Sequence, residues 1–232
     1  MRRSPAAAGM EREASRQPPS STCTGFAGEE ASQVYFTSGG ARRRTHDNIG
    51  TAARSCQEKR PDRLVHFDAH VDTWKENFGQ KYGHGSVFFH AIEEELVDPR
   101  RMIQIGIRSP VQKDVFDWTL SKGVTIVTAE DAHMRTPKEI AETIRAVVGE
   151  QATYLSFDID ALDPAFAPGT GTPEVGGLAT WQAQAILRRL ENIDFIGMDV
   201  VEVSPVYDTA EITALAAATI VWEYLALIAL SQ

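Results

Sequence analysis

The chain has 232 residues, of which 43% are hydrophobic, and a formal net charge of −9 at pH 7. A chain of this length and composition can bury the core of one sizeable globular domain, and its negative charge argues against general nucleic-acid binding. Its two cysteines, Cys23 and Cys56, fit no disulfide or metal motif. This favours a reducing compartment, so we expect a cytoplasmic protein.

Residues 1–62 differ in character from the rest of the chain. They carry a net charge of +3, whereas residues 63–232 carry −12, and large apolar residues are scarce in them. Such a segment cannot bury enough apolar surface to offset the entropy lost on ordering. We therefore interpret residues 1–62 as a mostly disordered or aberrant segment, followed by a well-patterned domain over residues 63–232.

From residue 64 onward the patterns predict alternating strands and helices. We expect strands at 64–67, 102–107, 124–128, 154–157 and 195–203, and helices at 113–122, 137–148, 180–192 and 212–230, while the segment 83–96 runs from a loop into a helix. Ser86 and Thr180 are candidate helix N-caps. The last helix is strongly apolar but contains Glu223, so we expect it to be buried rather than to span a membrane. The alternation predicts a mostly parallel sheet covered by helices.

Two acidic runs follow two of these strands. Asp68, His70 and Asp72 alternate in the first run, and Asp158 and Asp160 alternate in the second. Alternate side chains of an extended chain point the same way, and in parallel sheets ligands bind beyond the carboxyl ends of the strands. One such run alone is as often a loop or helix cap. Two together favour a two-metal site, and oxygen ligands with one imidazole favour Mn²⁺, Mg²⁺ or Fe²⁺.

Three motifs resemble those of the arginase/agmatinase ureohydrolase family, most of all its agmatinase members. They read HFDAHVD at 66–72, SFDIDALDP at 156–164 with PGTGTPE at 168–174, and GMDVVEVSP at 197–205. The resemblance covers about residues 63–230. It implies a three-layer α/β/α fold, two Mn²⁺ ions in an intact subunit, and hydrolysis of a guanidinium group to urea and an amine.

The resemblance also implies a role for each metal ligand. Asp68 and Asp158 match the carboxylates that bridge the two ions. His70 and Asp160 match ligands of one ion, and Asp72 matches a ligand of the other. Two cations that share carboxylates can lower the pKa of water, which supports hydrolytic attack on the guanidinium carbon at neutral pH.

Two further residues match substrate-handling positions of the family. Glu202 matches the carboxylate that binds the substrate guanidinium as a bidentate pair. His84 matches the proposed proton shuttle to the leaving amine, a task that suits imidazole because its pKa lies near working pH. The remaining histidines of the domain, His66, His90 and His133, are interpreted as structural.

The implied reaction converts agmatine to putrescine and urea, a step of polyamine biosynthesis. The implied partners are a small guanidinium substrate and other copies of the chain in a trimer or hexamer, with no nucleic acid and no membrane. A guanidino-acid hydrolase acting on 4-guanidinobutyrate and a non-catalytic ureohydrolase-like binding protein remain alternatives. A metal-dependent deacetylase would share the broad fold, but the motifs argue against it.

The sequence departs from the family before residue 63. The family carries a Gly-Gly-Asp-His motif whose histidine completes the coordination of one ion. Here residues 44–50 read RTHDNIG, and His46 lies 22 residues before Asp68, one residue short of the family spacing. The N-terminal strands of the family also have no counterpart in this segment. We therefore expect an incomplete catalytic domain that binds one ion poorly and has weak or no activity.

Overall fold

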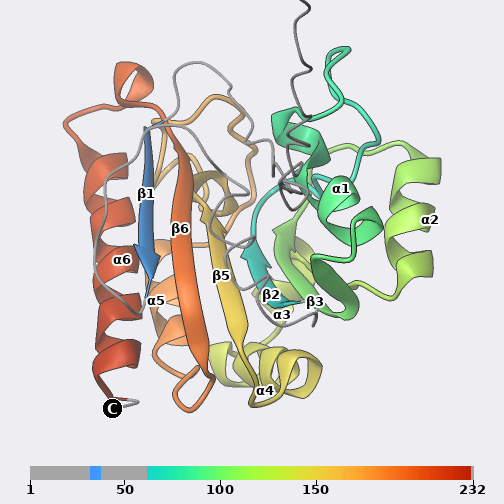
Figure 1. Cartoon of the computed structure of the whole chain (residues 1–232). Helices are drawn as coiled ribbons and strands as arrows, with labels where there is room; N and C mark the ends of the chain where they lie inside the picture. Colours follow the sequence, from blue (N-terminus) through green and yellow to red (C-terminus); the bar gives the residue numbers. More distant parts are fainter. Residues whose placement is uncertain (1–31, 38–61, 231–232) are drawn as a thin grey trace, which may run out of the picture.

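The computed structural model describes residues 32–37 and 62–230 (Figure 1). The interpretation of residues 1–62, and the part of it that concerns His46, therefore lies mostly outside the described residues. Within that segment, residues Ser32–Thr37 form strand β1, which the sequence patterns did not predict. The next strand, β2, spans Asp62–Phe67 and so begins two residues before the predicted start.

A six-stranded sheet forms the middle layer, in the order β1-β6-β5-β2-β3-β4. Parallel pairing joins β2 to β3 (Val97–Ile107) and β5 (Thr153–Asp158), β3 to β4 (Thr125–Thr128), and β5 to β6 (Phe195–Val203). Among the described strands β1 alone is antiparallel, and it covers the outer edge of β6. The predicted mostly parallel sheet is confirmed.

Among the described residues, six α-helices flank this sheet. They are α1 (Val87–Glu93), α2 (Lys113–Lys122), α3 (Ala129–Met134), α4 (Pro137–Val148), α5 (Thr180–Leu187) and α6 (Ile212–Leu230). Figure 1 shows α5 and α6 beside the β1–β6 end of the sheet, and α1 and α2 beside the β2–β3 end. The bounds of α2, α4, α6 and β6 agree with the sequence patterns.

The best-predicted helix has strong local signals. In α4 the Thr136 side chain accepts from the Glu139 backbone N–H, the Glu139 carboxylate accepts from the Thr136 N–H, and Pro137 occupies the first turn. Such a capping box satisfies backbone donors that a helix start leaves free.

Weaker signals gave wrong bounds. Helix α1 ends at Glu93 and β3 begins at Val97, so Pro99 lies inside a strand, next to a register irregularity with β2. Helix α5 ends at Leu187, short of the predicted end at 192, and its N-cap is Ala179 rather than Thr180. Ser86 occupies the N-cap position of α1 but makes no side-chain cap bond there.

Strand alternation separates a large core from the face that carries the site. Val65 and Phe67 of β2 are fully buried in the main core with α3, α4, α5 and α6, whereas Leu64 packs on the opposite face with Phe88 of α1. Burial of each side chain of this size contributes about 1.5–3 kcal/mol to the stability of the fold. Because Leu64, His66 and Asp68 alternate with the core residues, the sheet presents them on the α1 side.

Helix α6 is long and apolar enough, by length and composition alone, to cross a membrane. One face of it, carrying Ile220 and Tyr224, lies in the main core against the sheet, as predicted for a buried helix. Its other face leaves Leu215 and Trp222 exposed.

Candidate metal centre

The predicted ligands meet where two neighbouring parallel strands end. Phe67 of β2 pairs with Phe157 of β5, so Asp68 and Asp158 emerge side by side at the same edge of the sheet. All five predicted ligands line one cavity of about 590 Å³: Asp68, His70, Asp72, Asp158 and Asp160. The two residues predicted to handle substrate, His84 and Glu202, line it as well.

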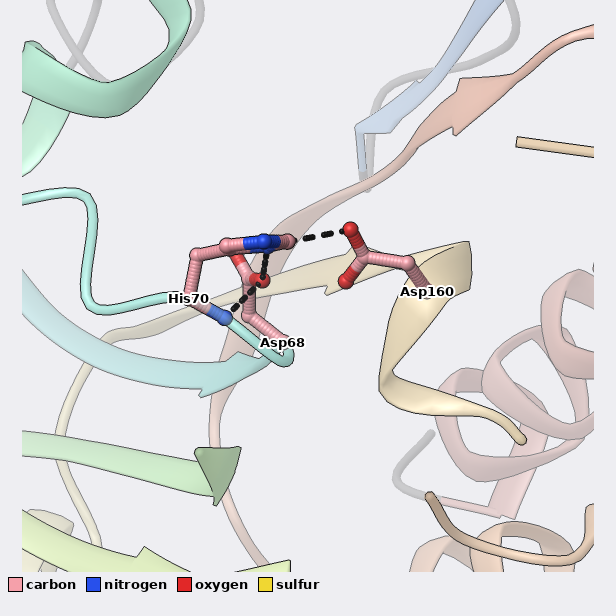
Figure 2. Close-up of side chains that lie close together, drawn as sticks. All are labelled: Asp68, His70 and Asp160. Carbon is pink, nitrogen blue, oxygen red and sulfur yellow. Dashed lines mark hydrogen bonds and ion pairs between the residues drawn. The ribbon is translucent and has the colours of Figure 1, made fainter. Parts of the chain in front are cut away.

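Three of these side chains form a tight group. The ligand atoms of Asp68, His70 and Asp160 all lie within 4.8 Å of one another. His70 Nδ1 is 3.2 Å from Asp68 Oδ1 and 3.1 Å from Asp160 Oδ2. Figure 2 shows the imidazole between the two carboxylates, with Asp160 reaching in from the turn after β5. The Ala69 N–H donates to Asp160 Oδ1 at 3.0 Å, which ties that turn to the segment after β2.

Asp72 and Asp158 lie outside this tight group but on the same cavity wall. Asp158 Oδ1 accepts the Asp160 N–H at 2.9 Å and so caps the short 3-10 helix Ile159–Ala161. The capping role and a ligand role are compatible, because one carboxylate offers two oxygens. Asp72 has a φ of 49°, a left-handed conformation that is uncommon for residues other than glycine.

Burial and mutual repulsion dominate the electrostatics of the cluster. Burial, reinforced by neighbouring carboxylates, raises the pKa of Asp68, Asp72 and Asp158 well above the usual range. Burial alone would lower the pKa of His70, but hydrogen bonds to Asp160 and Asp68 more than offset it and raise that pKa to about 11. Burial would likewise raise the pKa of Asp160, but the His70 imidazole holds it below its ordinary value.

The donor set fits divalent cations. A cation placed among carboxylates with raised pKa values stabilises their charged forms most. Asp68 Oδ2 is buried without an aligned hydrogen bond among the described residues, although His66 Nε2 lies 3.0 Å away, off the line of a good bond. Four carboxylates and one imidazole, with no thiolate, are typical of hard metal ions such as Mn²⁺.

His84 and Glu202 form an ion pair with each other at the mouth of the cavity, between His84 Nδ1 and Glu202 Oε1. The hydrogen bond to Glu202 raises the pKa of His84. Strict alternation along β6 would turn Glu202 to the face opposite Val201. Its φ of 61° breaks that alternation, and both residues line the cavity.

The sequence patterns missed Arg108, which follows β3. Its half-buried guanidinium donates to backbone carbonyls on both sides of the site, among them Asp160 O at 2.7 Å. They also missed the partnership of Gln104 with His66, whose Nδ1 lies 3.1 Å from Gln104 Nε2. A glutamine inside an otherwise apolar strand was the signal that could have identified this pair.

Comparison with known proteins adds a family match over most of the chain. The model of the arginase family matches residues 30–226. An agmatinase of Edwardsiella ictaluri is 48% identical over 162 residues, which are 70% of this chain and 50% of that protein. The chain therefore spans about half the length of the curated relatives it matches.

Solved structures give the same relationship. A hypothetical agmatinase from Burkholderia thailandensis superposes with a TM-score of 0.69 at 43% identity, covering 75% of this chain and 53% of that one. Proclavaminate amidino hydrolase from Streptomyces clavuligerus superposes with a TM-score of 0.72 at 42% identity, covering 78% and 60%.

Proposed function

Because this chain belongs to the arginase family, we propose that it hydrolyses the guanidinium C–N bond of agmatine to give putrescine and urea. The observation that carries the proposal is the buried group of Asp68, His70 and Asp160 in a cavity shared with Glu202. A guanidinium is planar and poorly electrophilic, so its hydrolysis needs a strong nucleophile held in line with its carbon.

The proposed cofactor is Mn²⁺, with two ions in an intact site. The residues that would hold them are Asp68, His70, Asp72, Asp158 and Asp160. Divalent ions bound there would lower the pKa of water enough for attack at neutral pH. Support comes from the pKa values of Asp68, Asp72 and Asp158, which burial raises and neighbouring carboxylates raise further, because a cation among them would offset both effects.

Glu202 and His84 are the proposed substrate-handling pair. Glu202 would accept two N–H bonds from the planar guanidinium, a charge-assisted geometry that fixes its orientation. His84 Nδ1 faces Glu202 Oε1, and the hydrogen bond to Glu202 raises the pKa of His84, which favours the protonated ring. A protonated imidazole beside the bound guanidinium can pass its proton to the leaving amine.

The charges around the cavity favour agmatine over guanidino acids. Arg63 is the one lysine or arginine among the described lining residues, and its guanidinium bonds Val148 O and Gln151 Oε1 instead. The carboxylate of 4-guanidinobutyrate would therefore meet no free cation among the described residues. The ammonium of agmatine needs no such cation. Guanidino-acid hydrolysis remains the alternative within this chemistry.

Activity in this chain is proposed to be weak. Five predicted ligands lie at the cavity, and the sixth position of the family falls in the segment outside the described residues. Even partners that only touch a ligand change metal affinity by about 10–100-fold, so loss of a ligand should weaken one ion at least as much. If neither ion binds, the alternative is a non-catalytic protein of the same family.

We propose a cytoplasmic location, supported by the cysteine usage, and a homo-oligomer. The exposed apolar residues Leu215 and Trp222 of α6 support self-association. Light scattering after size exclusion tests it: a trimer or hexamer is expected, and a monomer at all concentrations would contradict it.

A substrate panel tests the function. Urea release is measured with Mn²⁺ from agmatine, arginine, 4-guanidinobutyrate and 3-guanidinopropionate. We expect slow release, greatest from agmatine, that is abolished in Asp158→Asn and unchanged in Asp114→Asn, an exposed carboxylate on α2. Preference for a guanidino acid would favour the alternative enzyme. No urea from any substrate at saturating Mn²⁺ would favour the non-catalytic protein.

A further inference from the structure

A row of four polar side chains crosses the sheet beneath the candidate metal ligands. The strand register pairs Gln104 with His66, His66 with Ser156, and Ser156 with Asp199. Their exposed fractions are 0%, 1%, 7% and 4%, so the whole row is buried. Parallel strands are usually apolar on both faces, and a buried polar group without a partner costs about 1–3 kcal/mol. The row is therefore costly unless its members are paired.

The pairing at one end of the row fixes the imidazole of His66. Gln104 Nε2 donates to Val71 O at 2.7 Å, and because a carbonyl only accepts, this contact identifies the amide nitrogen. The same nitrogen lies 3.1 Å from His66 Nδ1, within reach of its second hydrogen. Nδ1 then accepts, and in the neutral ring the hydrogen is on Nε2.

The Nε2 atom lies beside a candidate metal ligand, although its N–H is not aligned on the nearest oxygen. His66 Nε2 lies 3.0 Å from Asp68 Oδ2, while Asp68 Oδ1 accepts the His70 N–H at 2.6 Å. Asp68 Oδ1 thus accepts from His70, and Oδ2 has the His66 Nε2 atom beside it without an aligned bond, so neighbours contact both oxygens of the carboxylate. Metal ligands are commonly oriented by such neighbours, which restrict their rotation before the ion binds.

The other end of the row makes no such contact. Tyr154 Oη donates to Asp199 Oδ2 at 3.1 Å. A hydrogen bond from Ser156 also reaches Asp199. Neither bond involves a predicted metal ligand. Tyr154 therefore provides a control at the same depth in the same sheet face.

We propose that His66, held in one tautomer by Gln104, is a positioning residue that orients Asp68 for metal binding. This inference rests on the proposed metal site, and it replaces the purely structural role expected for His66. His66 also packs against Phe88, with ring centroids 4.3 Å apart. Packing alone would require a side chain of similar size at residue 66, whereas positioning requires the N–H.

Variants of the full chain separate these two requirements. His66→Gln keeps an N–H near the position of Nε2, whereas His66→Leu removes it, and Gln104→Met removes the donor that sets the tautomer. Mn²⁺ affinity is measured by calorimetric titration, and thermal unfolding of the metal-free protein reports folding. We expect affinity to fall about 10–100-fold in His66→Leu, to fall less in Gln104→Met, and to be largely retained in His66→Gln and Tyr154→Phe.

The tautomer gives a second readout that a packing role would not change. Imidazole ¹⁵N chemical shifts, with His66 identified by its absence from His66→Gln, should show the Nε2–H form in the unaltered chain. Gln104→Met should lose that preference. Because this measurement uses the metal-free protein, it remains decisive even where His66→Leu fails to fold.

Three results would overturn the inference alone. They are unaltered Mn²⁺ affinity in a folded His66→Leu, an equal loss in His66→Gln and His66→Leu, and an Nδ1–H tautomer in the unaltered chain. An unaltered chain that binds no Mn²⁺ would overturn the proposed function, and this inference with it. Absence of Mn²⁺ binding by the unaltered chain therefore identifies failure of the proposed function, whereas the three results above identify failure of the inference about His66.

Discussion

Arg108 should be the side chain on which the geometry of the site depends most. Its guanidinium donates to six backbone carbonyl oxygens, those of Gly106, Asp160, Ala161, Leu162, Glu174 and Val175. These carbonyls belong to the end of β3, to the turn that carries Asp160, and to the Gly/Pro-rich loop after it. The guanidinium of Arg108 thus joins three segments of the chain around the candidate metal centre by hydrogen bonds.

Replacement of Arg108 by methionine keeps the stem of the side chain and removes all of its N–H donors. Each buried carbonyl left without a donor costs about 1–3 kcal/mol. Because the group is only half-buried, water can reach some of the carbonyls, and we expect a total loss of about 3–5 kcal/mol. Arg108→Lys retains donors for about three of the carbonyls and should cost roughly half as much.

Urea unfolding followed by tryptophan fluorescence measures this loss as a shift of the midpoint at constant slope. Arg101→Met is the control, because Arg101 makes one exposed bond to Val147 O, and we expect a loss below about 1 kcal/mol. An Arg108→Met midpoint equal to that of the unaltered chain, or a loss no greater than in Arg101→Met, would refute the reasoning.

Three further predictions concern neighbouring groups. Gly177→Ala should lower the stability of the fold by about 1–3 kcal/mol in thermal unfolding, because a Cβ there would lie 2.6 Å from Asp163 N. Gly171→Ala is the control and should cost little, because a Cβ there would have nothing within 4 Å. Equal losses in the two variants would contradict this prediction. Burial raises the pKa of Asp199 to about 6, so the folded state binds that proton more tightly than the unfolded state does. The free energy of unfolding should therefore fall by about 3 kcal/mol as the pH rises from about 4 to above 6. In urea unfolding, Asp199→Asn should therefore be more stable than the unaltered chain at pH 8 and equally stable near pH 4. A variant less stable than the unaltered chain at pH 8 would contradict the predicted direction of this pH effect. Glu202→Gln should lower the pKa of His84 toward 6.5 in an NMR titration, because the hydrogen bond to Glu202 is the main cause of the raised pKa, and an unmoved pKa would exclude that cause.

Local signals in the sequence were enough to predict the elements that carry the ligands. Strand ends followed by alternating acids placed Asp68 and Asp158 at one edge of the sheet, since side-chain alternation and parallel pairing leave little freedom there. The capping box of Thr136 and Glu139 gave the start of α4 for the same reason, because its partners are three residues apart.

Features set by distant contacts could not be predicted. Strand β1 forms by pairing with β6, more than 150 residues away along the chain. Glu202 enters the cavity because its positive φ breaks the strand alternation, which no residue pattern announces. Arg108 acts on carbonyls up to 67 residues away, and its role is invisible until the loops are in place.

The most direct test of the proposed metal centre is the amount of Mn²⁺ bound by the full chain. Equilibrium dialysis followed by metal analysis should find one ion per chain at low Mn²⁺ and a second only at concentrations about tenfold higher or more. Asp160→Asn should lose the tighter ion, because it alters the group of Asp68, His70 and Asp160. No bound Mn²⁺ in the unaltered chain, or the same amount in Asp160→Asn, would contradict a metal site at this cluster.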